Sequence, residues 1–386
     1  MTFPTGSPLR GSPAYLDTVS SEPLHPAARE TLLAALDRGW ADPLRLHGPG
    51  REARLLLDNA REVVAALLGA RPDEVSFTAS GTQAVHLGVL GLLLGRRRTS
   101  SRLVHGAVEH SAVMAAGAWW CRHFSGTTDA VPVDAQGHVL LDALDEALSR
   151  EPAGVAAVQV ANPEVGTLQP LAEVAATAAR HDVPLFADAA AAAGRIELPG
   201  GWQAAAASAH KWGGPAGVGV LVVRKGARWR APFPTDDRTD ARVAGFENVP
   251  AVLAAAAALQ AVVAEREEVG ARQHALVGRL RAGLAGLEDV DVVGDPARRL
   301  PHVLTFSCLY VDGESLVTEL DRLGFAVASG SACTASSLEP SHVLAAMGAL
   351  THGNVRVSLA RDTTEAEVDR LLAVLPGLLA RLRPAG

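Results

Sequence analysis

Cys333 lies in the stretch VASGSACTASSLEPSHVLAAMG and is one of three cysteines in a chain of 386 residues. A structural cysteine usually sits in an apolar, periodic segment, where it packs like a small hydrophobic residue. Cys333 instead follows a Ser-Gly-Ser turn signal and precedes a polar run that ends at Pro340. This context predicts a thiol on a loop that is accessible to other groups.

A lysine is the second residue that could do chemistry. Lys211 and Lys225 are the only lysines in a chain that otherwise uses arginine for positive charge. Lys211 stands in SAHKWGGPAGVGVL, beside a Gly-rich turn, whereas Lys225 ends an apolar run and is interpreted as a surface charge. A lysine whose pKa is lowered can form a Schiff base, and an arginine cannot. Lys211 is therefore predicted to be functional.

Further polar residues follow apolar runs, and ligands collect at the carboxyl edge of a parallel sheet. Asp188 in FADAA could cap a helix or pair with the ring nitrogen of pyridoxal phosphate. Gly81 and Thr82 in FTASGTQA lie at a strand-to-helix junction, where backbone N–H groups can cradle a phosphate. His110 in AVEHSAV could stack on a cofactor or be an ordinary polar residue. Arg356 in NVRVSLARDTT could hold a carboxylate in a cleft or form a surface salt bridge.

Alternating elements must position these residues. From about residue 50 to 225, helical patterns separate short apolar runs, namely EVSFTAS, SRLVHGAV, GVAAVQVAN, VPLFADAA and GVGVLVVRK. This alternation predicts an α/β fold with a mostly parallel sheet flanked by helices. A long helical pattern from Asn248 leads to a C-terminal α+β region with the strands HVLTFSC and VRVSLA and the helix EAEVDRLLAVLPGLLARL. We expect a large domain over 14–260, a small domain over 261–386, and a tail over 1–13 that is disordered or packs on the small domain.

Composition excludes several classes of protein. A formal net charge of −7 without a basic cluster argues against a nucleic-acid surface. The cysteines form no CxxC pair, so we expect neither a disulfide framework nor a metal site. The N-terminus lacks a charged start followed by an apolar run, so no signal peptide is expected. Charge or glycine interrupts the Ala-rich runs, so we expect no membrane span and a cytoplasmic protein.

Together these residues resemble the cysteine desulfurases of the NifS/IscS type, which are class-V aminotransferase-like enzymes of the fold-type I pyridoxal-phosphate group. The resemblance extends from YLD at Tyr15 to RDTTEAEVD at Asp369. It is most specific at SGSACTASSLEPSHVLAAMG, which is typical of the members with a long active-site loop. In addition, VEHSAV matches the motif TEH-x-AV, and SAHK matches the Schiff-base motif S-x-HK.

The resemblance implies a homodimer with a large sheet domain and a smaller C-terminal domain. It implies that L-cysteine is converted to L-alanine while sulfur passes to Cys333 as a persulfide, for a sulfur-acceptor protein that the sequence does not identify. Lys211, His110 and Cys333 would be catalytic, and pyridoxal 5'-phosphate would be the cofactor. The implied cofactor contacts are Gly81, Thr82, His110, Asp188, Ser208, His210 and Lys211, and the implied substrate contacts are Arg356 and Asn162.

Several positions depart from the family pattern. Pro163 replaces an Asn of N-N-E-x-G, Ala191 replaces a Gln, and Phe246 replaces a Thr of R-x-G-T, whose Arg is Val243. Each lost hydrogen bond is worth about 0.5–1.5 kcal/mol, so these departures predict weaker cofactor retention. The run TVSSE also replaces NAATT near the N-terminus.

Two alternatives stay open. Another pyridoxal-phosphate lyase or aminotransferase of this fold, such as a selenocysteine lyase, would need no loop cysteine. A degenerate sulfur-relay or scaffold relative would fit the departures, but the retained Lys211, His110 and Cys333 oppose it. The sequence ends at ARLRPAG, without the tail that contacts an iron–sulfur scaffold in some members. Delivery of sulfur to tRNA, DNA or natural-product pathways is therefore open as well.

Overall fold

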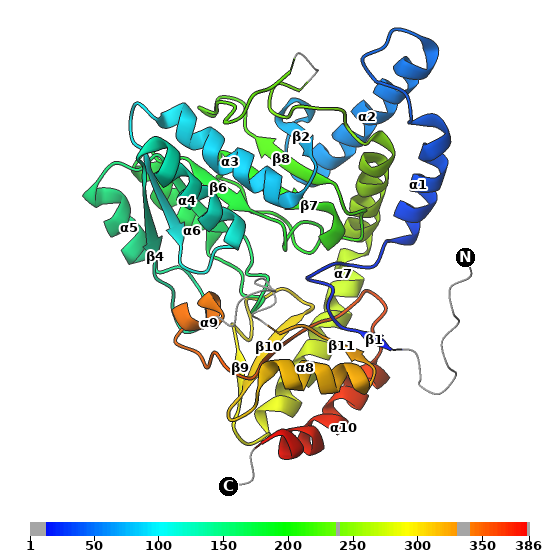
Figure 1. Cartoon of the computed structure of the whole chain (residues 1–386), viewed down its shortest axis with the longest axis vertical. Coiled ribbons are helices and arrows are strands. Elements are labelled where there is room, and N and C mark those ends of the chain that lie inside the picture. Colours follow the sequence, from blue (N-terminus) through cyan, green and yellow to red (C-terminus); the bar gives the residue numbers. More distant parts are fainter. Residues whose placement is uncertain (1–12, 237–239, 330–339, 384–386) are drawn as a thin grey trace.

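The computed structural model describes residues 13–236, 240–329 and 340–383. A seven-stranded sheet forms the core of the larger part, in the order β2-β8-β7-β6-β5-β3-β4 (Figure 1). Strand β8 runs antiparallel to β2 and β7, and the other paired strands run parallel. The predicted α/β fold with a mostly parallel sheet is thus confirmed. The strands are β2 (Val75–Thr78), β3 (Arg102–Gly106), β4 (Thr127–Val131), β5 (Val155–Gln159), β6 (Leu185–Asp188), β7 (Ala204–Ser208) and β8 (Gly219–Val223).

Both faces of this sheet are covered by helices, which is why its strands are continuous apolar runs rather than alternating ones. Neighbouring strand residues point to opposite faces. Val155 packs in the cluster with helices α3 and α4, whereas Ala156 packs in the cluster with α2, α5, α6 and the start of α7. The helices of this part are α1 (Pro26–Arg38), α2 (Gly48–Leu67), α3 (Gly81–Arg96), α4 (Ser111–Phe124), α5 (Leu141–Arg150) and α6 (Leu171–Arg180).

Helix α7 (Val249–Ala285) joins the two parts (Figure 1). Its first third, Val249–Leu259, packs in the core of the large sheet, and Leu276–Leu284 pack in the second core. Asn248 caps it by accepting a hydrogen bond from Ala251 N–H at 3.2 Å. By length and composition this helix could cross a membrane, because one 18-residue window of it has a mean hydropathy of 1.4. Half of that window is buried inside the protein, as in a core helix.

The smaller part contains an antiparallel sheet in the order β12-β10-β9, with strands β9 (Val290–Val293), β10 (Val303–Cys308) and β12 (Asn354–Ser358). Its helices are α8 (Gly313–Arg322), α9 (His342–Ala346) and α10 (Glu365–Leu382). Strand β1 (Ala14–Tyr15) pairs in parallel with β11 (Phe325–Ala326) of this part, and Ala14 and Leu16 lie in its core. The large domain was predicted to begin at residue 14, but these first strand residues belong to the C-terminal unit.

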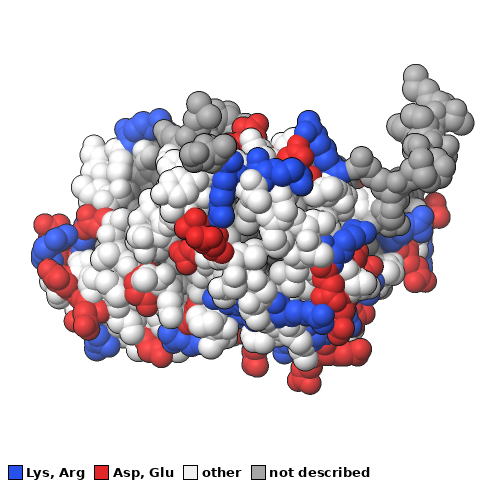
Figure 2. All heavy atoms as spheres, turned by 90° about the horizontal axis from the view of Figure 1, so that it is seen from below, with Lys and Arg blue, Asp and Glu red and all other residues white. Residues whose placement is uncertain are grey.

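Charged side chains are interspersed on the face that Figure 2 shows, where basic and acidic residues lie beside one another. This agrees with a composition of 35 Lys and Arg against 42 Asp and Glu. A single-sign field, which would attract a polyanion, does not develop on that face.

Candidate active site

The carboxyl ends of the central parallel strands converge on one edge of the large sheet. Asp188, the last residue of β6, pairs in register with Gln159 of β5 and Ala206 of β7. The Asp188 side chain is buried, and its Oδ1 accepts a hydrogen bond from Ala190 N–H at 2.9 Å. A carboxylate therefore stands at the point where the fold class collects its ligands.

Lys211 follows directly after β7, in a short 3-10 turn (η2, Ala209–Lys211). Gly213 ends this turn with a φ of +81°, a left-handed conformation that glycine adopts without strain. Lys211 is half-buried, and its charge adds to the effect of burial, which lowers the pKa of His110 and of His210. The two lysines lie in different surroundings, as predicted. Lys225 is exposed beyond β8, where its backbone N–H donates a hydrogen bond to Glu74 Oε1 at 2.7 Å.

A small cradle lies where helix α3 begins. A Cβ atom on Gly81 would lie 2.6 Å from Ser208 Cβ and 2.9 Å from Ser208 Oγ, so only glycine leaves this contact open. Ser208 Oγ is also 3.0 Å from His210 Nδ1. The first N–H groups of a helix lack intrahelical partners, so those of Gly81 and Thr82 can serve an anion. Hydroxyl, ring and backbone groups here fit a phosphate.

His110 caps helix α4. Its Nδ1 accepts a hydrogen bond from Ala112 N–H at 3.1 Å, so the neutral ring carries its proton on Nε2. Burial lowers the pKa of His110 and the nearby Lys211 lowers it further, while Asp188 opposes them. The ring is therefore neutral at neutral pH. His110, Asp188 and Lys211 are far apart in the sequence, but the charges of Asp188 and Lys211 both act on the His110 ring.

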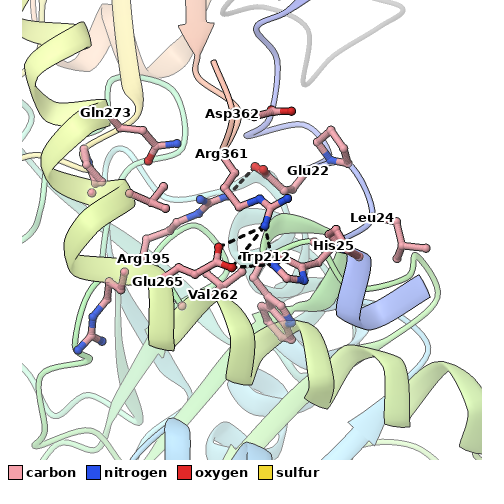
Figure 3. Close-up of a pocket in the computed structure, with 18 residues that line it drawn as sticks. Glu22, Leu24, His25, Arg195, Trp212, Val262, Glu265, Gln273, Arg361 and Asp362 are labelled. Atoms are coloured by element: carbon pink, nitrogen blue, oxygen red, sulfur yellow. Dashed lines mark hydrogen bonds and ion pairs between the residues drawn. The ribbon is translucent and has the colours of Figure 1, made fainter. Parts of the chain in front are cut away.

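A cavity of about 170 Å³ with charged walls is lined by Trp212 and Gly213, the two residues that follow Lys211 in the chain (Figure 3). Glu22 N–H donates to His210 O at 2.8 Å, and Arg195 Nη2 donates to Lys211 O at 3.3 Å. Glu22 and Arg195 are both buried and form an ion pair of 2.5 Å. Because both partners also hydrogen-bond to the backbone carbonyls of His210 and Lys211, the pair holds the backbone that carries Lys211. Removing one partner of such a buried pair costs about 3–5 kcal/mol. Sequence reasoning missed this pair because its members are distant in the chain.

Arg356 lies on β12 and is buried, which excludes the alternative of a surface salt bridge. Its Nη2 donates to Asp17 Oδ1 at 2.8 Å and to Ser20 Oγ at 2.7 Å, and its Nη1 donates to Pro163 O at 3.3 Å. The guanidinium thus lies between the N-terminal segment, the small sheet and the loop after β5. Asp17 and Ser20 were not singled out from the sequence.

The loop after β5 gives Asn162 a clear local task. Its Oδ1 accepts from the N–H groups of Glu164 and Val165 at 2.8 and 2.9 Å, and its Nδ2 donates to Val108 O at 3.1 Å. These bonds order the loop, and the predicted role of Asn162 in substrate binding stays a prediction. Pro163 follows it and contributes its carbonyl to Arg356.

The other departures lie near the cradle. Ala191 is partly buried against the main core, just beyond Asp188. Val243 and Phe246 line a groove with Ala79 and Gln83 beside the start of α3. Ala191 thus lies shortly after Asp188 in the chain, and Val243 and Phe246 lie beside the start of α3.

Two buried glutamates near the site were missed. Glu109 is 1% exposed and its Oε2 has no hydrogen-bond partner in the part of the chain that the structure describes. Burial raises the pKa of Glu109 well above its usual range, and Asp188 adds to that shift. Burial likewise raises the pKa of Glu164 to about 7. Sequence offers only one signal for them, which is that each lies inside a quoted motif, VEHSAV or NPEVG.

The two cysteines that the structure describes differ in burial. Cys308 is fully buried, and burial raises the pKa of its thiol to about 11. Cys121 is only half-buried. Cys333 lies outside the described residues, between β11 and α9 in the chain.

A parallel sheet with a lysine, an aspartate and an anion cradle at its carboxyl edge, closed by a small domain with a buried arginine, defines an aminotransferase-like α/β enzyme. The chain belongs to the aminotransferase class-V family, whose model matches residues 14–371.

Similar proteins span nearly the whole chain. An IscS-like cysteine desulfurase of Mycobacterium tuberculosis is 39% identical, over 96% of this chain and 98% of that protein. A cysteine desulfurase of Gluconacetobacter diazotrophicus is 35% identical, over 96% of this chain and 94% of that protein. A solved NifS-like protein superposes with a TM-score of 0.88 at 27% identity, covering 96% of this chain and all of that one.

Proposed function

We propose that this protein is a pyridoxal-phosphate-dependent cysteine desulfurase that converts L-cysteine to L-alanine and passes the sulfur to Cys333. The carrying observation is that His110, Asp188 and Lys211 lie in one electrostatic environment beside the Gly81–Ser208 cradle. The names of the relatives, which are cysteine desulfurases, support the same reaction.

The residues present fit pyridoxal phosphate. Its phosphate would bind at Gly81, Thr82, Ser208 and His210, its ring nitrogen at Asp188, and its aldehyde carbon at Lys211. When bound, the cofactor supplies an electron sink that makes the bonds at Cα and Cβ of an amino acid breakable. Arg356 would orient the substrate carboxylate. Lys211 Nζ would move the Cα proton, and the neutral His110 ring presents a donor at Nε2.

The sulfur step needs a thiolate nucleophile. The Cys333 thiolate would attack the sulfur of the substrate, so that an S–S bond forms while the Cβ–S bond breaks. The electron pair of the broken bond stays with the carbon skeleton, which is then protonated to alanine. The balance is one cysteine and one thiol in, and one alanine and one persulfide out. The persulfide would be delivered to an acceptor protein.

A homodimer in the reducing cytoplasm completes the proposal. Helices α1 and α2, with the turn between them, expose five large apolar side chains, which would be covered by a second copy. These side chains are Leu33, Leu36, Trp40, Leu46 and Leu55. Light scattering of the purified protein measures the oligomeric state directly.

The test of the reaction compares the two lysines. We expect Lys211→Ala to lose cofactor absorbance and alanine production and to stay folded, whereas Lys225→Ala keeps both. Alanine production by Lys211→Ala at the wild-type rate would refute the proposal. A Cys333→Ser variant separates the alternatives, because an aminotransferase or a lyase without a thiol acceptor would stay active in it.

A further inference from the structure

Glu164 is a buried acid beside the proposed substrate arginine. It lies in the loop after β5, directly after Pro163, whose carbonyl accepts from Arg356 Nη1. Its backbone is fixed on both sides, because its N–H donates to Asn162 Oδ1 at 2.8 Å and its carbonyl accepts from Thr305 Oγ1 at 2.6 Å. The backbone of Glu164 is therefore held between the loop after β5 and strand β10 of the small domain.

The Glu164 carboxyl has few partners in that place. The residue is 6% exposed, and within the described ranges its Oε1 has no hydrogen-bond partner. The hydroxyl of Ser341, which caps α9, hydrogen-bonds to the carboxyl group, and the Arg356 charge acts on it from β12. Burial outweighs both of these contacts and raises the pKa of Glu164 to about 7.

The charge around Arg356 depends on this one proton. Arg356 already forms an ion pair with Asp17 at 2.8 Å, from the N-terminal segment. Its Nε is buried and lacks a partner among the residues described. With Glu164 neutral, one carboxylate faces the guanidinium, and a substrate carboxylate becomes the second. With Glu164 ionised, a second negative charge already acts on the guanidinium, although the two groups form no direct ion pair.

We propose that Glu164 is a positioning residue that sets the affinity of the Arg356 subsite for the substrate carboxylate. In its neutral form it leaves the guanidinium available, and in its ionised form it competes for the same positive charge. Glu164 would act through Arg356, whose charge already acts on the Glu164 carboxyl group. This inference rests on the proposed role of Arg356 in the desulfurase reaction.

The test uses two amines that differ only in a carboxylate, L-alanine and ethylamine. Each is titrated into the holoenzyme from pH 6 to 8.5, and binding is followed by the visible absorbance of the cofactor. Protonation of the amine changes in parallel for both ligands over this pH range, so its effect cancels in the ratio of the two dissociation constants. We expect the advantage of L-alanine over ethylamine to fall about tenfold as pH rises, since a like charge at the subsite costs roughly that much.

The matched variant is Glu164→Gln, which keeps the shape and can still accept from Ser341. In this variant the advantage of L-alanine should be independent of pH and should equal the wild-type value at pH 6. A pH-independent ratio in the wild type, or an unchanged pH dependence in Glu164→Gln, overturns the inference. If Glu164→Gln does not fold, the wild-type comparison of the two ligands still decides. Turnover of L-cysteine at pH 6.5 tests the proposed function separately, because the binding titration needs no sulfur transfer.

Discussion

The Gly81–Ser208 contact allows one substitution to test the proposed phosphate cradle. In Gly81→Ala the new methyl would lie 2.6 Å from Ser208 Cβ, a separation that non-bonded carbon atoms do not adopt. Either the start of α3 or Ser208 must move, and overpacking of this kind costs about 1–3 kcal/mol. If this cost reduces the free energy of phosphate binding at the cradle, the dissociation constant of pyridoxal phosphate rises about 5- to 150-fold, at 1.4 kcal/mol per tenfold.

The assay is the fraction of cofactor retained after dialysis, followed by titration of the apoprotein with pyridoxal phosphate. Gly278→Ala is the matched control, because a Cβ on Gly278 in α7 meets nothing within 4 Å. Pyridoxal, which has no phosphate, should bind Gly81→Ala and wild type alike. Retention of pyridoxal phosphate by Gly81→Ala as strong as by Gly278→Ala would refute the assignment of the cradle.

Two further predictions concern buried groups. The pKa of Glu164 rises to about 7 in the folded chain from 4.5, so the folded state holds this proton longer than the unfolded state does. The contribution of Glu164 to the free energy of unfolding is therefore fully present below pH 4.5 and is lost between pH 4.5 and 7, by about 3 kcal/mol. Denaturant unfolding at several pH values should show that Glu164→Gln lacks this loss. Cys308→Ser should lower the free energy of unfolding by about 1–3 kcal/mol, because it buries a hydroxyl group. In the wild type, mass spectrometry after brief exposure to cysteine should find the added sulfur on Cys333. The thiol of Cys308 stays protonated, because its pKa is about 11. A persulfide on Cys308, or an unchanged midpoint of Cys308→Ser unfolding, would contradict this assignment.

Strong local patterns predicted most of the large sheet and the long helix. The runs that became β3, β5, β6 and β8 are rich in branched or aromatic residues, which favour strands. Strand β7 was missed because its sequence, AAAAS, carries no such signal, and its neighbours β6 and β8 impose the strand on it. Strand β4, an edge strand with the sequence TTDAV, is largely exposed at its start and has no apolar run to reveal it.

The candidate site was predictable where a motif carried it and not where distant segments meet. Lys211, His110 and Asp188 follow recognisable runs, so their grouping at one sheet edge could be inferred. The ion pair of Glu22 with Arg195 could not, because it depends on tertiary contact between residues far apart in the chain. The same holds for the contact of Arg356 with Asp17, which forms only when the two ends of the chain meet.

The pairing of β1 with β11 has a consequence for how this chain acquires its fold. Ala14 is synthesised before the strands of the large sheet, and its partner Phe325 is synthesised only after all of them. The core around Ala14 and Leu16 therefore cannot close while the large sheet is being assembled. The buried arginine subsite, which also uses Asp17 from this segment, becomes complete in the same late step. A nascent chain that stops short of β11 would hold a finished sheet and an unfinished enzyme.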